Sequence, residues 1–204
     1  PFVIDPHMSS EKKVYFQNDR INILCVGKYE ERKNQLMLLE ICSKLISKYN
    51  LHITLVGEMS TSYHQQHYEK IQKFIEEHDM CDMVECYTNQ KPDSMSVFYE
   101  KADMFVLPST GEFASVSQLE AMSYSLPVIV SDTNGTSCYV ESGQNGYVFR
   151  DNDVDDMMDK LSKILADRDI IVEMGRHSYQ LVNQKYSFLN YKTAIEKIIN
   201  TSFS

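Results

Sequence analysis

The chain has 204 residues, of which 43% are hydrophobic, and its formal net charge is −9 at pH 7. A chain of this length buries roughly 70% of its unfolded surface, so it can form one substantial core. The acidic balance argues against a nucleic-acid partner or an acidic membrane surface, because both attract basic faces. No apolar run approaches the ~18–20 residues that span a bilayer, and the first residues do not resemble a signal peptide.

The cysteines lack the C-x-x-C spacing that is typical of zinc sites and redox pairs. Cys25 falls in an apolar run and Cys42 on the apolar side of a helical pattern, so both are predicted to be buried free thiols. The odd number of cysteines favours a reducing compartment, and we therefore expect a cytoplasmic protein. All five are Cys25, Cys42, Cys81, Cys86 and Cys138.

Residues 1–20 are polar, are interrupted by prolines and show no sustained period, which predicts an extended lead-in. From residue 21 onward, short apolar runs alternate with stretches whose apolar residues recur at helical spacing. We expect one domain at 21–204. Its predicted strands are Ile21–Val26, Leu51–Val56, Met83–Tyr87, Met104–Leu107, Val128–Val130 and Tyr147–Phe149.

Helices are predicted between and after these strands. They run through Leu36, Leu39, Cys42 and Ile46, near 62–78, over Ser94–Lys101, over 115–124, from Val154 to Leu165 with Asp153 as N-cap, and near 168–185 and 188–200. Strands alternating with helices are typical of an α/β fold. The prediction is a doubly wound, mostly parallel sheet, a Rossmann-like arrangement covered on both faces, with C-terminal helices.

The stretch PSTGEFASVSQLEAM at 108–122 is the most informative in the chain. An apolar strand ends at Pro108, and a turn of small residues then leads into a helix. This arrangement points free backbone N–H groups at an anion. Glu112 is expected on the turn, and Glu120 one to two turns inside the helix. The pattern predicts a phosphate near Ser115 and a hydroxylated group near Glu120.

Two distant loops are expected to meet at one crevice. In a doubly wound sheet of order 3-2-1-4-5-6, the first and fourth strands are neighbours, and ligands bind outside their carboxyl ends. The loop after the first strand carries Lys28 and Lys33, and the loop after the fourth carries Glu112. If the strand order is correct, these residues face one another.

Five blocks occur in the order of a known family. They are GKYEERKN at 27–34, YEKADMFVLPS at 99–109, the two-glutamate stretch at 108–122, LEAMSYSLPVIVSD at 119–132 and SGQNGYVF at 142–149. The chain resembles the C-terminal, donor-binding domain of retaining GT-B glycosyltransferases of family 4, the group 1 glycosyl transferases. PFVIDP at 1–6 resembles the segment that leaves the hinge of such enzymes. The resemblance thus implies a fragment without its N-terminal acceptor domain.

The resemblance also implies roles for individual residues. Lys33 and Glu112 match catalytic positions, Lys33 at the diphosphate and Glu112 at the donor sugar. Lys28 stands where the family usually has arginine, and Glu120 would accept the ribose hydroxyls. Backbone N–H groups that would hold the donor belong to Phe113, Ala114, Ser115 and Val116, and a base pocket would be lined by Thr88, Asn89 and Gln90.

The chain departs from the family at several positions. Lysine at position 28 lacks the planar fork of arginine, and Asn34 replaces a glycine, which predicts a left-handed or turn residue. Phe113 and Ser115 replace two glycines, which makes close approach of the backbone to a ligand harder. Ser137-Cys138-Tyr139 lacks an acidic residue that the family often has, so the sugar specificity stays open.

Other interpretations compete with these. Glu112 and Glu120 alone would fit a solvated helix face or a glycoside hydrolase, although a hydrolase does not need a lysine-bearing phosphate loop. Asp151, Asp153 and Asp155 form two overlapping D-x-D patterns that resemble metal motifs, but helix capping is favoured. His64 and His67 are interpreted as an exposed polar helix face, and no metal site is predicted.

The function implied by the resemblance is transfer of a hexose-type sugar, with retention, from a UDP- or GDP-sugar to an acceptor, without a metal cofactor. The partners would be the nucleotide-sugar donor and the N-terminal acceptor domain, with no nucleic acid and no membrane segment. The missing domain would mediate any peripheral membrane contact, and the fragment alone would be inactive.

The alternative is a non-catalytic α/β domain that binds a nucleotide or another ligand. Gly27 alone does not make the G-x-G-x-x-G of a dehydrogenase. The sugar, the base and the acceptor stay open.

Overall fold

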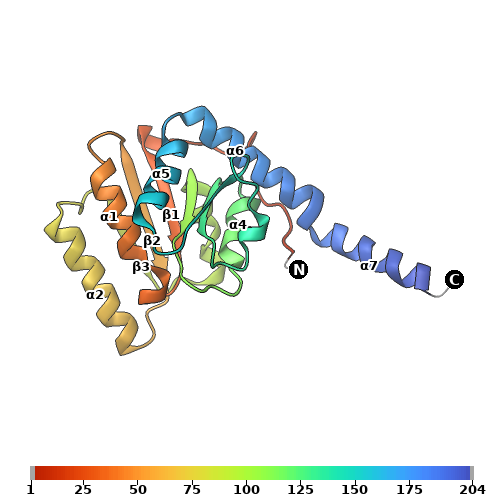
Figure 1. Ribbon diagram of the computed structural model, residues 1–204, viewed down its shortest axis with the longest axis horizontal. Helices are drawn as coiled ribbons and strands as arrows, with labels where there is room; N and C mark the ends of the chain where they lie inside the picture. Colours follow the sequence, from red (N-terminus) through yellow and green to blue (C-terminus); the bar gives the residue numbers. More distant parts are fainter. Residues whose placement is uncertain (1–2, 203–204) are drawn as a thin grey trace.

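The computed structural model describes residues 3–202 and contains a six-stranded parallel sheet (Figure 1). Its strand order is β3-β2-β1-β4-β5-β6, which confirms the assumed order. The α/β, doubly wound fold is therefore confirmed as well. The strands are β1 (Ile21–Val26), β2 (Leu51–Gly57), β3 (Val84–Thr88), β4 (Met104–Leu107), β5 (Val128–Ser131) and β6 (Gly146–Phe149).

The helices agree with the predicted segments to within a few residues, with one difference. They are α1 (Gln35–Leu45), α2 (Ser62–Glu77), α3 (Ser96–Lys101), α4 (Val116–Ser123), α5 (Val154–Leu165), α6 (Arg168–Leu181) and α7 (Phe188–Ser202). The segment near 168–185 is not one α-helix, because α6 passes into a π-helix at Val182–Tyr186. Side-chain periodicity alone does not distinguish the two kinds of backbone turn.

The core lies in two layers, one on each face of the sheet. Alternate residues of β1 supply both layers, since successive strand side chains point to opposite faces. Ile23 and Cys25 pack in the layer under α1, α2 and α5, whereas Leu24 packs in the layer that contains α4. Cys25 and Cys42 are buried free thiols, as predicted, and burial raises the pKa of each to about 12.

The segment before β1 contains a turn at 10–12 and a 3-10 helix at Gln17–Asp19, and it is attached to the body of the domain. The N–H of Ile4 donates to the carbonyl of Tyr186, and the N–H of Met8 donates to the carbonyl of Ser123. The buried amine of Lys13 donates to the Tyr99 carbonyl at 2.9 Å. These bonds tie residues 4–13 to α3, α4 and the π-helix. The proposed boundary between 1–20 and 21–204 stays a prediction.

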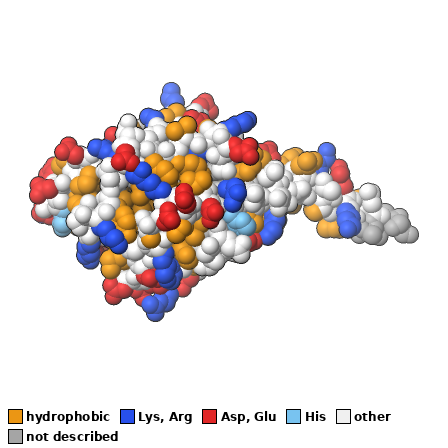
Figure 2. Space-filling model, turned by 90° about the horizontal axis from the view of Figure 1, so that it is seen from above, with side chains coloured by type: hydrophobic (Ala, Val, Ile, Leu, Met, Phe, Trp, Pro, Cys, Tyr) orange, Lys and Arg blue, Asp and Glu red, His pale blue; other side chains and the backbone are white. Residues whose placement is uncertain are grey.

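Helix α7 projects beyond the body of the molecule (Figure 1), and hydrophobic side chains lie on its surface (Figure 2). Among these exposed side chains are Leu189, Ile195 and Ile198. In the part of the chain that the structure describes, no helix has both the length and the apolar character needed to cross a bilayer.

Candidate ligand-binding site

The loop after β1 is held rigidly against the sheet. Tyr29 is fully buried, and its hydroxyl donates to the carbonyls of Leu55 at 3.1 Å and Tyr87 at 2.9 Å. Asn34 adopts a left-handed conformation, with φ 54° and ψ 32°, between a short 3-10 turn (Glu31–Lys33) and α1. The predicted left-handed residue at position 34 is therefore confirmed. Asparagine tolerates this conformation at low cost.

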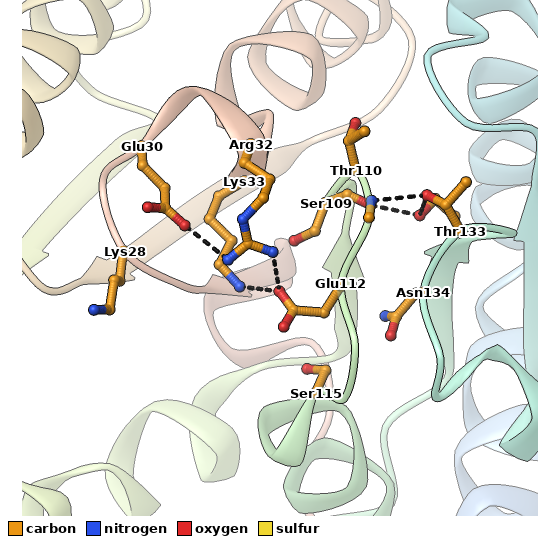
Figure 3. Close-up of polar contacts among 12 residues, drawn as sticks. Lys28, Glu30, Arg32, Lys33, Ser109, Thr110, Glu112, Ser115, Thr133 and Asn134 are labelled. Atoms are coloured by element: carbon orange, nitrogen blue, oxygen red, sulfur yellow. Dashed lines mark hydrogen bonds and ion pairs between the residues drawn. The ribbon is translucent and has the colours of Figure 1, made fainter.

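Lys33 and Glu112 lie together, across the carboxyl ends of β1 and β4. The Lys33 amine contacts Oε2 of Glu112, and each side chain is only 12% exposed (Figure 3). Their contact confirms that the loops after β1 and β4 meet, as the strand order predicted. Burial raises the pKa of Glu112, but hydrogen bonding and charge attraction from Lys33 and Arg32 outweigh it, and the net pKa is lowered.

Arg32 belongs to the same cluster, and the sequence did not indicate it. Its Nη1 lies 3.0 Å from Oε2 of Glu112, and its Nη2 lies 2.8 Å from Oε1 of Glu30. The carbonyl of Arg32 also accepts a hydrogen bond from the N–H of Thr110 at 2.8 Å. The charged run at 30–33 was visible in the sequence, but the direction of each side chain depends on the 3-10 turn.

The turn that carries Glu112 is fixed by the segment after β5. The N–H of Gly135 donates to the Glu112 carbonyl at 2.7 Å, and the N–H of Gly111 donates to Oγ1 of Thr133 at 3.0 Å. A Cβ atom on Gly135 would overlap the Phe113 carbonyl, so the close approach requires glycine there. The Phe113 side chain is 96% exposed beside the crevice.

Helix α4 begins at this turn. Ser115 is its N-cap, and its Oγ accepts a hydrogen bond from the N–H of Gln118 at 3.3 Å. Ser115 lies next to Glu112 in Figure 3. The first turn of a helix leaves backbone N–H groups without helical partners and carries a partial positive charge. The predicted segment of Ala114, Ser115 and Val116 therefore brings the positive end of α4 to the Lys33–Glu112 pair.

A pocket of about 480 Å³ adjoins the loop, lined by Lys28, Glu58, Asn89, Gln90 and Glu120 together with apolar side chains and two glycines. Four of the predicted site residues line it. Thr88, the last residue of β3, does not line it.

Glu120 lies inside α4, as expected, and its Oε2 accepts a hydrogen bond from the Tyr99 hydroxyl at 2.6 Å. A bond of this kind holds the carboxylate in one orientation, and the sequence did not indicate that Tyr99 would supply it.

The two predicted lysines occupy different parts of the crevice. The amine of Lys28 lies 3.3 Å from Oε2 of Glu58, with both side chains about half exposed. Lys28 stands apart from the Lys33–Glu112 pair in Figure 3. Lys28 lines the pocket with Glu120, whereas Lys33 faces Glu112 at the start of α4.

The interpretation of His64 and His67 as an exposed face is wrong. Both are buried, because this side of α2 packs towards the loop at 28–34. Nε2 of His64 lies 4.0 Å from Oε2 of Glu30. Burial lowers the pKa of the His67 imidazole, whose Nε2 has no hydrogen-bond partner within the described residues.

The acidic residues near 151–153 have a structural role. Asp153 caps α5, since its Oδ1 accepts a hydrogen bond from the N–H of Asp156 at 2.9 Å, and the predicted cap is confirmed. Among residues 3–202, no group of three or more His, Cys, Asp and Glu side chains could hold a metal ion.

The six-stranded parallel sheet, with helices on both of its faces, defines a doubly wound domain of the Rossmann-like class. A model of the family "Glycosyl transferases group 1" matches residues 9–181. The chain therefore belongs to the group 1 glycosyl transferases.

A curated relative from the same family illustrates the similarity. The capsular polysaccharide biosynthesis glycosyltransferase CapM of Staphylococcus aureus is 24% identical over 210 residues, which cover 98% of this chain and 51% of the relative. The chain thus spans about half the length of that relative.

Solved structures share the fold. Sucrose-phosphate synthase from Thermosynechococcus elongatus superimposes with a TM-score of 0.80 at 19% identity, over 100% of this chain and 52% of that one. The Anabaena protein HepE, solved in complex with UDP and glucose, gives a TM-score of 0.77 at 14% identity, over 91% of this chain and 51% of its own.

Proposed function

We propose that this domain binds a nucleoside-diphosphate sugar and forms the donor half of a retaining glycosyltransferase. The acceptor would be bound by an N-terminal domain outside this sequence. The contact of Lys33 with Glu112 at the positive end of α4 carries the proposal. It places an amine, which suits a diphosphate, next to a carboxylate, which suits sugar hydroxyls, and both lie beside a pocket that is lined by Glu120. The complex of HepE with UDP and glucose supports a UDP-sugar as donor.

Each part of the crevice has a role in this proposal. Asn89 and Gln90 line the base end of the pocket, and Glu120 accepts the vicinal ribose hydroxyls. Lys28 and Lys33 balance the charge of the diphosphate, and Glu112 holds the sugar with the backbone N–H groups of 113–116. No metal ion is required in this arrangement.

The reaction breaks the bond between the anomeric carbon and the diphosphate oxygen. Negative charge then builds on the leaving oxygen, and preorganised cations and N–H groups stabilise it. The acceptor oxygen bonds to the anomeric carbon on the same face, and its proton passes to a phosphate oxygen of the departing nucleoside diphosphate. A hexosyl group is thereby transferred with retention, in the cytoplasm, during glycan biosynthesis.

Calorimetric titration of the 204-residue chain tests the proposal. We expect UDP or GDP to bind with a micromolar Kd, and the corresponding monophosphate to bind at least about tenfold more weakly, since it lacks one phosphate contact worth roughly 1.4 kcal/mol. If neither diphosphate binds, the chain is better described as a non-catalytic α/β domain with another ligand.

Glu120→Gln tests the ribose contact. Glutamine keeps a carbonyl acceptor for the Tyr99 hydroxyl but replaces the second acceptor oxygen with a donor. Wild type should prefer the ribonucleoside diphosphate over its 2′-deoxy form by roughly tenfold, and the variant should lose most of this preference. If the wild type and the variant show the same preference, Glu120 does not bind the ribose hydroxyls.

The isolated chain is expected to show no sugar transfer. In the proposal another domain binds the acceptor, so this chain alone does not hold the acceptor next to the donor sugar and does not accelerate the transfer. Release of nucleoside diphosphate from UDP- and GDP-sugars can be followed with a coupled assay, in the presence of simple glycoside acceptors. Sustained transfer by these 204 residues would contradict the assignment of the acceptor site to another domain.

A further inference from the structure

Four charged groups at the crevice form a neutral cluster. Nη1 of Arg32 and the amine of Lys33 both contact one oxygen of Glu112, and Nη2 of Arg32 contacts Glu30 at 2.8 Å (Figure 3). Two cations are therefore balanced by two carboxylates. A diphosphate oxygen that takes the position between the two cations must displace the Glu112 carboxylate, because both cations already contact its Oε2.

The shared oxygen marks a position that suits an anion. Two cationic donors converge on it, and the positive end of α4 lies next to it at Ser115. A phosphate oxygen placed there would receive the same charge-assisted hydrogen bonds that Oε2 of Glu112 receives now. The carboxylate of Glu112 thus occupies the place of a ligand oxygen.

Lys28 does not supply a cation at this position. Its amine pairs with Glu58 at 3.3 Å and lines the pocket instead. A guanidinium presents a planar fork that matches phosphate geometry, which an ammonium group does not. In this chain the guanidinium closest to the Glu112 oxygen comes from Arg32, at 3.0 Å.

The backbone holds Arg32 in place while its side chain stays accessible. Its carbonyl accepts a hydrogen bond from the N–H of Thr110, which joins the loops after β1 and β4. Its side chain is 44% exposed, compared with 12% for Lys33. An incoming ligand can therefore reach the guanidinium without rearrangement of the loop.

We propose that Arg32 binds the diphosphate of the donor directly, and that Glu112 occupies the position between Arg32 and Lys33 until the ligand displaces it. This inference rests on the proposed function. Once displaced, the Glu112 carboxylate is free to accept hydrogen bonds from the donor sugar. Arg32 thereby supplies the phosphate fork that position 28 lacks.

Arg32→Gln is the first test, with titration of the nucleoside diphosphate that the wild type binds. We expect the Kd to rise by about 10- to 100-fold, because a charge-assisted and bidentate contact is lost. Arg168→Gln is the matched control. It removes the same charge from an arginine that is 43% exposed and pairs with Asp19, away from the crevice. The control should change the Kd less than about twofold.

Glu112→Gln is the second test, with inorganic pyrophosphate and the nucleoside diphosphate as ligands. Glutamine keeps the shape of the side chain but removes the competing negative charge. Both ligands should bind about 3- to 10-fold more tightly, since they no longer displace an ion pair. Unchanged or weaker binding would overturn the displacement of Glu112.

The outcomes separate this inference from the proposed function. If the wild type binds neither UDP nor GDP, the proposed function fails. If the wild type binds and Arg32→Gln binds equally well, only the role of Arg32 fails. Thermal unfolding of each variant shows whether the fold is retained. Weaker binding by Arg32→Gln together with tighter binding by Glu112→Gln, each at an unchanged Tm, supports the inference.

Discussion

Lys33→Ala should weaken binding of UDP or GDP by roughly 30-fold to nearly 1000-fold, the largest single effect expected in this protein. The Lys33 amine is mostly buried beside Oε2 of Glu112, so water cannot take over its interaction with a bound phosphate when the amine is removed. Truncating one partner of a buried, charge-assisted contact typically costs about 2–4 kcal/mol or more in binding, and each 1.4 kcal/mol is about tenfold in Kd. Calorimetric titration measures the effect directly.

Two further variants make this result specific. Lys33→Met keeps an apolar stem of similar length, which packs beside Gly27, and should bind as weakly as Lys33→Ala. Lys44→Ala removes an exposed lysine that pairs with Glu40 on α1, and it should leave binding unchanged. If Lys33→Met binds as the wild type does, the amine has no part in ligand binding and the proposed site is wrong.

Gly135→Ala should disturb the site and the fold together. The added Cβ would overlap the Phe113 carbonyl, so the turn at 112–113 must move away. Such overpacking typically costs about 1–3 kcal/mol, and each kcal/mol lowers the Tm of a domain of this size by about 2–4 °C. Because the moved turn carries Glu112 and the start of α4, we expect nucleotide binding to fall by at least about tenfold.

Gly111→Asn is the matched control for Gly135→Ala. Gly111 lies on the same turn with φ 58°, and nothing lies within 4 Å of an added Cβ. Asparagine tolerates a left-handed conformation, so both the Tm and the Kd should stay near the wild-type values. Differential scanning calorimetry and titration of both variants would show whether the overlap at Gly135 causes the expected loss of stability and of nucleotide binding. Wild-type binding by Gly135→Ala would show that the turn adapts without cost.

Most of the secondary structure could be predicted from the sequence. The bounds predicted for β1 and β4 agree with the structure, because buried parallel strands are continuous apolar runs between polar loops. The N-cap at Asp153 and the left-handed Asn34 were also predicted correctly, since both depend on local backbone chemistry. The π-helix at 182–186 was missed, because its apolar pattern resembles that of an α-helix.

The candidate site could be predicted only in part. The strand order implied that Lys33 and Glu112 would meet, since the carboxyl ends of β1 and β4 are neighbours. It did not imply that Lys28 would turn towards Glu58 or that Arg32 would join Glu112. Burial of His64 and His67 was missed for the same reason. Helical spacing says which side chains share a face, but not which loop covers that face.

The sequence by itself determined the order of strands and helices, the crevice at their carboxyl ends and the family to which the chain belongs. Only the tertiary structure decided that Arg32 joins Lys33 at Glu112 and that Lys28 pairs with Glu58 instead. The choice depends on hydrogen bonds between distant segments, such as the one from Thr110 to Arg32 and the one from Gly135 to Glu112. Bonds of this kind set the direction of loop side chains, and no local pattern of residues encodes them.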